Sequence, residues 1–576
     1  MAETLLSPGV LARENDQSFI QGQPLERGAA IIGPTVKGPV EIPTIVGSFS
    51  EFTAIFGGAV QSGSNVYSYL TSIAASNYFQ NGGTSLLVTR VVSGSFTSAT
   101  SSLVPTGSGG PTSGLSPFVL ETISEGIIMN STSTEISGAL ASGSTDNVRW
   151  EIPTVNTASG TFSLLIRRGD DNNVQKIVLE SYNNLSLDPY APNYISKVIG
   201  DVNYNLITTD GYYIQQTGSY SNVSKYVRVK QVNFNTPKYF DNNGIAKSAF
   251  TGSLPAVSSG SFGGAVGSNI PVGRVANFYQ NIGLNAGADT QGLVAADYAN
   301  AIALLSNVDE YQYNVISAPG LIHEVHATPV NNIVNNTIGR GDAIAIVDLK
   351  MYGAQINGVI NQAAAFDSSY AATYWPWLQT IDPNNGEAVW VPASTMLPGV
   401  YAFTDASSDP WFAPAGITRG GLGQVIRAER KLTASNRDDL YEANVNPIAT
   451  FPGTGVTVFG QKTLQKRASA LDRVNVRRLL IALKSFIGQV AEGLVFEQNT
   501  AATRNNFLSQ VNPYLESVQQ RQGLYAFKVV MDETNNGPDV VDRNELVGQI
   551  FLQPTRTAEF IVLDFNVLPT GAVFPA

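Results

Sequence analysis

The chain changes character twice, and these changes limit the folds that it can form. Before residue 93 and after residue 290, short apolar runs alternate with helical patterns. Residues 93–290 begin and end with Ser- and Gly-rich stretches and carry strand-like runs separated by turn residues. Alternation of helix and strand indicates an α/β sheet domain. We therefore predict an α/β domain assembled from residues 26–92 and 291–420, interrupted by a mostly β insertion at 93–290.

The predicted elements follow from periodicity and turn residues. Helices are expected at 64–79 and 293–305. The expected strands are short apolar runs: 29–32, 85–92, 162–168, 174–180, 225–232, 311–317 (ended by Pro319-Gly320), 343–349 and 370–378.

We predict a second, C-terminal α/β domain at residues 421–554. A long amphipathic helix is expected at 468–498, with one apolar stripe formed by Leu479, Leu483, Phe486, Val490 and Leu494. A second helix is expected at 501–521, bent at Pro513, and strands follow at 524–531 and 546–552. The fold class is thus multidomain, a mixture of α/β and α+β.

We predict an extended arm at each end of the chain. Residues 1–25 are polar and lack a helical period, so we expect an extended segment that does not fold alone. Residues 555–576 contain a strand at 559–568 in which apolar residues alternate with period two. Such an apolar strand needs two neighbours or a partner chain.

Composition excludes several function classes. Only 14% of the 576 residues are charged, against about 25% in ordinary proteins, which favours a subunit that buries surface against copies of itself. The net charge of −11 argues against nucleic acid as the main partner. Cysteine is absent, and we find neither a secretory signal nor a spanning apolar run, so we expect assembly in a cytoplasm.

No catalytic, cofactor or metal site is predicted. His323 and His326 are spaced i, i+3, whereas a metal-binding helix needs i, i+4. There is no GxSxG elbow and no GxxxxGK[ST] loop. The aromatic residues Tyr374, Trp375 and Trp377 are interpreted as buried strand residues and not as a sugar platform.

Several phrases together resemble the contractile tail sheath family of phages and related injection machines. They occur in one order over the whole chain except the insertion: SPGV at 7–10, GPTVKGPVEIPTIVGSFSEFTAIFGG at 33–58, AASNYFQNGGTSLLVTRV at 74–91, ISAPG at 316–320, SSYAATYWPWLQTIDP at 368–383, WFAPAGITRGGL at 411–422, EGLVFEQNT at 492–500, GLYAFKVVMDETNN at 523–536 and PTRTAEFIVLDF at 554–565.

This resemblance implies a non-enzymatic subunit that forms stacked hexameric rings around an inner tail tube and contracts. Baseplate and tail terminator proteins are implied as further partners, with no stable membrane insertion. The arms are implied to add strands to the sheets of neighbouring subunits. The expected strand-exchange residues are Ser7, Pro8, Gly9, Val10, Leu11, Glu14, Phe560, Ile561, Leu563, Phe565 and Val567.

A basic cluster stands out in this acidic chain. It consists of Lys462, Lys466, Arg467, Arg473, Arg477, Arg478 and Lys484, with Asp472 as the one acid among them. Two interpretations remain open: a solvated helix face, or a contact with an acidic inner tube. For the whole chain the alternatives are another self-assembling shell, layer or fibre protein, or a secreted β-rich hydrolase or adhesin.

Overall fold

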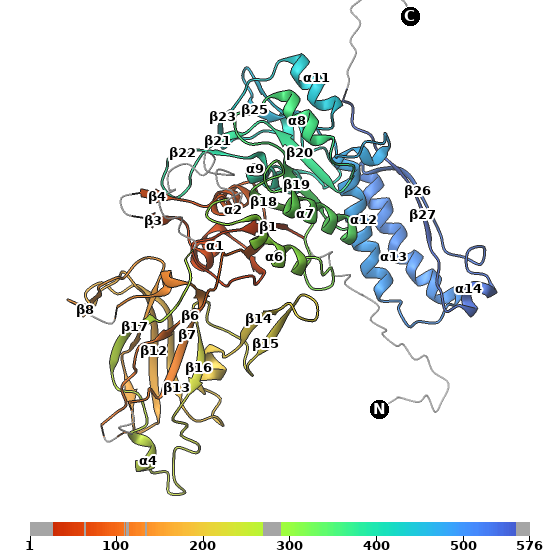
Figure 1. The fold of residues 1–576 in the computed structure, drawn as a ribbon. Helices are drawn as coiled ribbons and strands as arrows, with labels where there is room; N and C mark the ends of the chain where they lie inside the picture. The colour runs from red at the N-terminus through yellow and green to blue at the C-terminus, as the bar shows by residue number, and fades with distance from the viewer. Residues whose placement is uncertain are drawn as a thin grey trace, which may run out of the picture.

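The computed structural model describes residues 27–62, 65–108, 110, 114–132, 135–268 and 290–559. Figure 1 shows a β-rich part, a central α/β part and a C-terminal part with the long helices α12 and α13. This multidomain mixture of helices and sheets confirms the predicted fold class. The N-terminal arm and the residues from 560 onward lie outside the described residues, so the two arms stay predictions.

Eight strands form the central sheet, in the order β2-β5-β1-β18-β19-β20-β24-β25. The strands from β5 to β24 run parallel, and the outer strands β2 and β25 are antiparallel to their neighbours. Their bounds are Thr44–Val46 (β2), Leu86–Arg90 (β5), Ala29–Gly33 (β1), Val315–Ile322 (β18), Ile344–Asp348 (β19), Ala371–Trp375 (β20), Asn446–Phe451 (β24) and Gly455–Val458 (β25).

One strand is longer than predicted. We expected the strand before Pro319-Gly320 to end there, but β18 continues to Ile322. The pairing of β18 with β19 shifts register between Ser317 and Ile322, so the N–H that Pro319 lacks falls where regular pairing is already interrupted.

The sheet also extends past the domain boundary that we expected at residue 420. Tyr374 of β20 pairs with Asn446 of β24, and the Asn446 side chain donates to the Thr373 carbonyl at 3.1 Å. The central sheet therefore includes residues up to Val458, and the C-terminal helices begin only at Val474.

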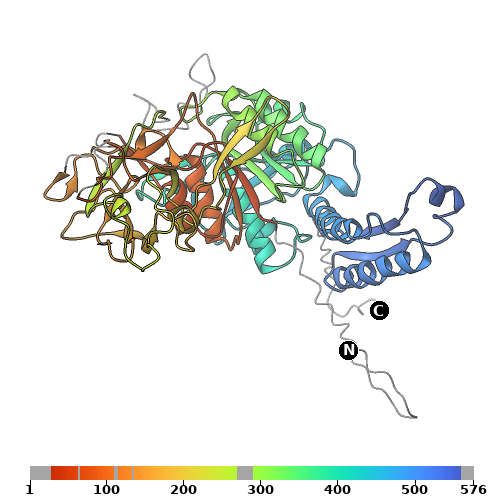
Figure 2. The same ribbon diagram turned by 90° about the horizontal axis from the view of Figure 1, so that it is seen from below.

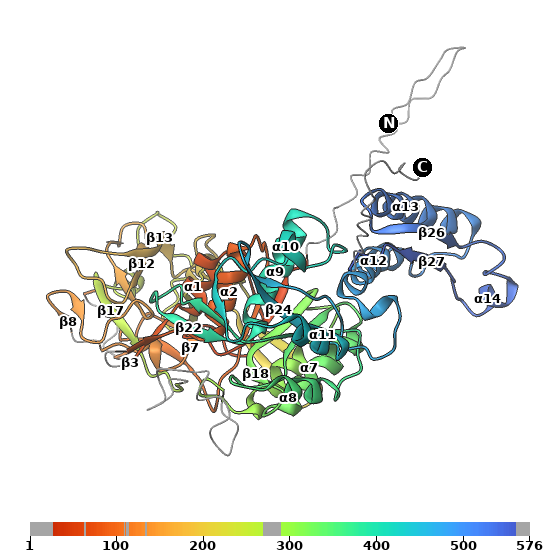
Figure 3. The same cartoon turned by 90° about the horizontal axis from the view of Figure 1, so that it is seen from above.

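Helices cover both faces of the sheet (Figures 2 and 3). In Figure 3, α2 and α9 lie on one side of the sheet, and α7 and α8 lie on the other. One core packs the sheet against α1 (Phe49–Phe56), α2 (Leu70–Gln80) and α9 (Ala393–Ser407). The other packs it against α6 (Ala299–Leu304), α7 (Ala327–Arg340), α8 (Ile356–Ala363) and α11 (Ala434–Glu442). Successive residues of β1 alternate between these cores, which explains why its whole sequence is apolar.

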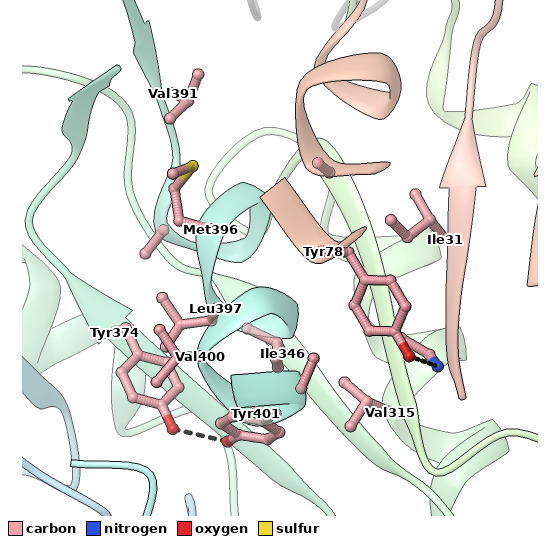
Figure 4. Close-up of a cluster of buried hydrophobic side chains, with 14 of the residues drawn as sticks. Ile31, Tyr78, Val315, Ile346, Tyr374, Val391, Met396, Leu397, Val400 and Tyr401 are labelled. Carbon is pink, nitrogen blue, oxygen red and sulfur yellow. Dashed lines mark hydrogen bonds between the residues drawn. The ribbon is translucent and has the colours of Figure 1, made fainter. Parts of the chain in front are cut away.

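Figure 4 shows part of the first core. The Tyr374 and Tyr401 hydroxyls lie 2.7 Å apart, and the Tyr78 hydroxyl accepts the Ala29 N–H at 3.3 Å. Helix α2 begins at Leu70, not near residue 64 as predicted, because the hairpin of β3 (Val60–Ser62) and β4 (Asn65–Tyr67) occupies the preceding residues.

The β-rich part has its own antiparallel sheet, in the order β11-β12-β10-β17-β6-β7-β16, with β13 beside β12. The bounds are Val155–Asn156 (β11), Thr161–Arg168 (β12), Val148–Ile152 (β10), Ser258–Gly263 (β17), Ser98–Ser101 (β6), Phe118–Glu125 (β7), Val227–Val232 (β16) and Val178–Ser186 (β13). A separate core around Trp150, Phe118 and Phe162 holds it together. The strand predicted at 174–180 begins only at Val178, since Val174 stands 96% exposed in the preceding turn.

Polar and apolar contacts join this part to the central sheet. Arg90, at the end of β5, is buried and donates to the Gly38 carbonyl at 2.6 Å and the Glu125 carbonyl at 2.9 Å. The hairpin of β14 (Asn203–Ile207) and β15 (Tyr213–Thr217) packs Leu206 and Ile214 against the second core of the α/β part. The β-rich part is thus held at two separate places.

Candidate assembly site

The C-terminal part is built on an antiparallel pair of helices, α12 (Val474–Glu492) and α13 (Ala501–Gln520). The predicted apolar stripe of α12 faces α13, and Phe486 stacks on Tyr514 with ring centroids 3.8 Å apart. The Thr500 hydroxyl caps α13 by accepting the Thr503 N–H at 3.3 Å. Pro513 lies inside α13, which continues to Gln520.

A β-hairpin lies against these helices. Strand β26 (Leu524–Val530) pairs antiparallel with β27 (Gln549–Pro554). Phe527 and Leu552 pack toward the helical core, whereas Tyr525 and Phe551 are 65% and 56% exposed. The hairpin therefore has one face that is covered by the helices and one that is open and partly aromatic.

The hairpin also has open edges. Among the described residues, β26 pairs with β27 alone and β27 pairs with β26 alone. Each outer edge consequently presents backbone N–H and C=O groups to whatever lies beside it. A two-stranded sheet is marginal by itself, so this hairpin is suited to accept further strands.

The last described residues are fixed beside the start of α12. The Arg473 guanidinium donates to both carboxylate oxygens of Glu559, at 2.7 and 3.0 Å. Tyr441 and Gln461 each donate to the same carboxylate, at 2.9 Å. Burial would raise the Glu559 pKa, but the hydrogen bonds from Arg473 and Gln461 hold that pKa below its ordinary value. The chain therefore reaches residue 560 from a defined position.

The predicted basic cluster is not one continuous surface. Lys466, Arg467 and Lys484 are exposed, and Lys462 is partly buried with its ammonium donating to the Tyr441 carbonyl at 2.7 Å. Arg477 and Arg478 are 4% and 3% exposed, although the sequence placed them on a charged surface.

These two buried arginines join α12 to the central sheet domain. Arg478 pairs with Asp405 of α9 at 2.5 Å and lies 4.7 Å from the Tyr401 ring centroid. Arg477 lies 4.0 Å from the Tyr370 ring centroid and donates to the Ser369 hydroxyl. Their role in this structure is structural, because water and other molecules scarcely reach them.

The histidines and strand aromatic residues that were candidates for a chemical site make hydrogen bonds and packing contacts within the fold. His326 accepts the Ile322 N–H at 3.0 Å, and His323 lies 2.6 Å from the Gln362 side chain. Tyr374, Trp375 and Trp377 are buried, as interpreted from the sequence. In the described part of the chain, acidic residues and histidines form no cluster suited to a metal ion. No described helix has the length and apolar character that a membrane crossing requires.

The usual ligand position of a doubly wound sheet is filled by the protein itself. In this sheet the strand order reverses between β1 and β18, where such folds bind ligands at the carboxyl ends of the strands. Gln291 occupies this position: its side chain accepts the Leu70 N–H at 2.8 Å and donates to the Pro319 carbonyl at 3.1 Å. The amino end of α2 is therefore already capped from within the chain.

Comparison with known proteins gives two family matches in the second half of the chain. Residues 291–464 match the phage tail sheath protein central domain, and residues 467–567 match the phage tail sheath C-terminal domain. The chain is 32% identical over 347 residues to the tail sheath protein of Vibrio phage KVP40, covering 58% of this chain and 51% of that protein. It is 38% identical over 207 residues to the tail sheath protein of Enterobacteria phage T4, covering 36% of this chain and 31% of that protein.

A solved structure supports the fold. The crystal structure of a sheath tail protein from Listeria innocua matches with a TM-score of 0.50 and 11% identity, covering 92% of this chain and 95% of that chain. The matched segments span about half or less of the lengths of the curated relatives. The two domain matches and these relatives identify residues 291–464 and 467–567 as domains of the contractile tail sheath family.

Proposed function

We propose that this chain is the subunit of a contractile tail sheath. Copies polymerise as stacked hexameric rings around an inner tail tube and, on contraction, drive the tube through a cell envelope. The observation that carries the proposal is the β26–β27 hairpin at the outer side of the C-terminal helices, because no described strand pairs with either of its outer edges. Sequence relatives that are themselves tail sheath proteins support it.

In this proposal the terminal arms of neighbouring copies complete the hairpin sheet. The predicted residues, Ser7 to Glu14 and Phe560 to Val567, lie outside the described residues. Each backbone hydrogen bond added to the hairpin stabilises by about 0.5–1.5 kcal/mol, so five such bonds contribute several kcal/mol. Tethers of this kind hold copies together while the folded bodies move between two packings.

The proposed partners are other copies of the chain, an inner tube, a baseplate and a tail terminator. Of the predicted tube-contacting residues, Lys484 is exposed on the flank of α12, whereas Arg477 and Arg478 are withdrawn into the interior. In this proposal the tube contact falls to Lys484. We place the particle in a virion tail or an extracellular contractile particle, assembled in a bacterial cytoplasm, and assign the chain no enzymatic activity.

Electron microscopy of the purified chain tests this function. We expect hollow cylinders of uniform bore, and discrete monomers at high concentration would contradict the proposal. Deleting residues 1–20 should abolish the cylinders. A finer variant, Val10→Pro with Glu14→Pro, removes two backbone donors and should also fail, whereas the matched Val10→Ala with Glu14→Ala should retain assembly. Equal assembly of the proline and alanine variants would refute strand addition by the N-terminal arm.

A further inference from the structure

An exposed aromatic residue marks the loop between α12 and α13. Phe496 is fully exposed, and Val495 beside it is 61% exposed. Phe496 has a φ of 70°, a conformation that residues with bulky side chains seldom adopt. The loop is nevertheless ordered by hydrogen bonds, including Glu497 N–H to the Leu494 carbonyl at 3.0 Å. Strain of this kind persists where the surrounding structure holds it, and it often accompanies a binding function.

The loop that carries Phe496 lies beside a second segment, and both segments are acidic. We name residues 492–500 and 532–545 the acidic tip, because the two segments contain seven acidic residues and one basic residue, with all seven acids exposed. The Asn499 side chain joins them by donating to the Glu545 carbonyl at 2.8 Å. Val541, in the short helix α14 (Pro538–Asp542), adds further exposed apolar surface.

The opposite end of α12 has the complementary character. We name it the basic end, after its cations Lys462, Lys466, Arg467, Arg473 and Arg556. A hollow of about 520 Å³ lies there, and its lining includes the apolar residues Ala468, Ala470, Val476 and Ala558. Asn475 also lines it; this residue is 3% exposed, and its Oδ1 has no hydrogen-bond partner among the described residues. Of the nearby acids, Asp472 and Glu559 are paired with Arg473, and Glu442 lies near Lys462. The Asp367 carboxylate accepts the Lys466 backbone N–H at 2.9 Å.

A single copy cannot join these two surfaces. The 19 residues of α12 separate them by about 28 Å at 1.5 Å per residue, and Figure 1 shows α14 and the amino end of α12 at opposite ends of the C-terminal part. Each copy carries one of each surface, so the contact can repeat from copy to copy. A head-to-tail contact between unlike surfaces generates rings or helical filaments.

We propose that the acidic tip of one copy docks on the basic end of the next copy, with the Phe496 ring in the hollow beside Asn475. This inference rests on the proposed sheath assembly and names a surface of it that is separate from the terminal arms. Glu497 then faces the exposed cation Arg467, and the Asn475 oxygen accepts a donor from the incoming loop. The occupant is a second copy because its charge and apolar residues match the basic end.

The absence of cysteine allows a direct test by disulfide trapping. In the full chain, Val495→Cys combined with Ala468→Cys should give a ladder of covalent oligomers under oxidising conditions, because a disulfide requires Cα atoms within about 7 Å. The separation along α12 prevents the bond within one copy. The matched control, Val174→Cys with Ala468→Cys, pairs a residue of the β-rich part and should give no ladder.

Assembled cylinders without a ladder would overturn this inference and leave the proposed function intact. Cross-linking of the Val495→Cys thiol to a different protein would also overturn it. Failure of the unmodified chain to form cylinders would refute the proposed function, and this inference with it.

Two substitutions test the contact without cysteine. Phe496→Ser should raise the protein concentration needed for assembly about tenfold, as expected for an anchoring aromatic residue, whereas Val174→Ser should leave it unchanged. Glu497→Arg should impair assembly, and Arg467→Glu in the same chain should restore it. All four positions are exposed, so circular dichroism of the variants should match the parent chain. An unchanged assembly concentration for Phe496→Ser, or no rescue by the double variant, would contradict the docking.

Discussion

Replacing Asp405 with alanine should weaken the attachment of α12 more than replacing its partner, Arg478, with methionine. The two side chains pair at 2.5 Å, but their surroundings differ: the Arg478 side chain is 3% exposed and the Asp405 side chain is 30% exposed. In Asp405→Ala, the guanidinium stays buried without its carboxylate, which costs about 3–5 kcal/mol in comparable sites. Water reaches the Asp405 position, so we expect Asp405→Ala to lower the free energy of opening α12 by about 3 kcal/mol, the lower end of that range. In Arg478→Met, water hydrates the Asp405 carboxylate and the methionine side chain fills the buried site. We therefore expect the free energy of opening α12 to fall by only about 1–2 kcal/mol.

Amide hydrogen exchange along α12 measures this difference locally, without requiring the whole chain to unfold in one step. A loss of about 3 kcal/mol speeds exchange from the opened state by more than about a hundredfold. The ion pair of Arg521 and Asp409 is the control, since it also bridges the two parts at 2.7 Å but its arginine is 49% exposed. Asp409→Ala should lower the free energy of opening α12 by about 1 kcal/mol or less, because the pair is largely exposed. A larger effect for Arg478→Met than for Asp405→Ala would refute the reasoning.

Three further predictions concern single positions. Burial raises the pKa of Asp348 to about 7 from its ordinary value of 3.8. As pH rises from about 4 to 7 the carboxyl ionises in the unfolded chain but stays protonated in the folded chain, so the free energy of unfolding should fall over this range. Asp348→Asn should remove that slope in thermal unfolding measured from about pH 4 to pH 8, and an unchanged slope would contradict the prediction. Leu515→Ala should destabilise the C-terminal part by about 2–5 kcal/mol because Leu515 is fully buried, and faster hydrogen exchange confined to α12 and α13 would show it. Gln291→Ala leaves the Leu70 N–H unpaired in a buried site and should cost about 2 kcal/mol, measured as lost protection in α2; full protection would argue against this capping role.

Periodicity and turn residues were enough to predict much of the fold. Five of the eight strands of the central sheet (β1, β5, β18, β19 and β20) were located within a few residues, because a strand buried on both faces reads as a continuous apolar run. The strands β2, β24 and β25 were not predicted. The stripe from Leu479 to Leu494 likewise predicted which side of α12 packs against α13. The helix start at Leu70 was misplaced because Val66 continues the helical spacing of Leu70 and Ile73 but lies in strand β4 of the preceding hairpin.

Sequence by itself determined the class of element, the interruption of the sheet domain by a β-rich segment and the absence of recognisable catalytic motifs, since these depend on local residue types. Tertiary structure decided which charges reach the surface. Arg467 and Arg478 look alike in the sequence, yet one is exposed and the other is buried against Asp405 and Tyr401. It also brought residues 492–500 beside 532–545 and set this tip a helix length away from the basic end. Both outcomes depend on contacts between segments distant in the chain, and spacing along one segment carries no information about them.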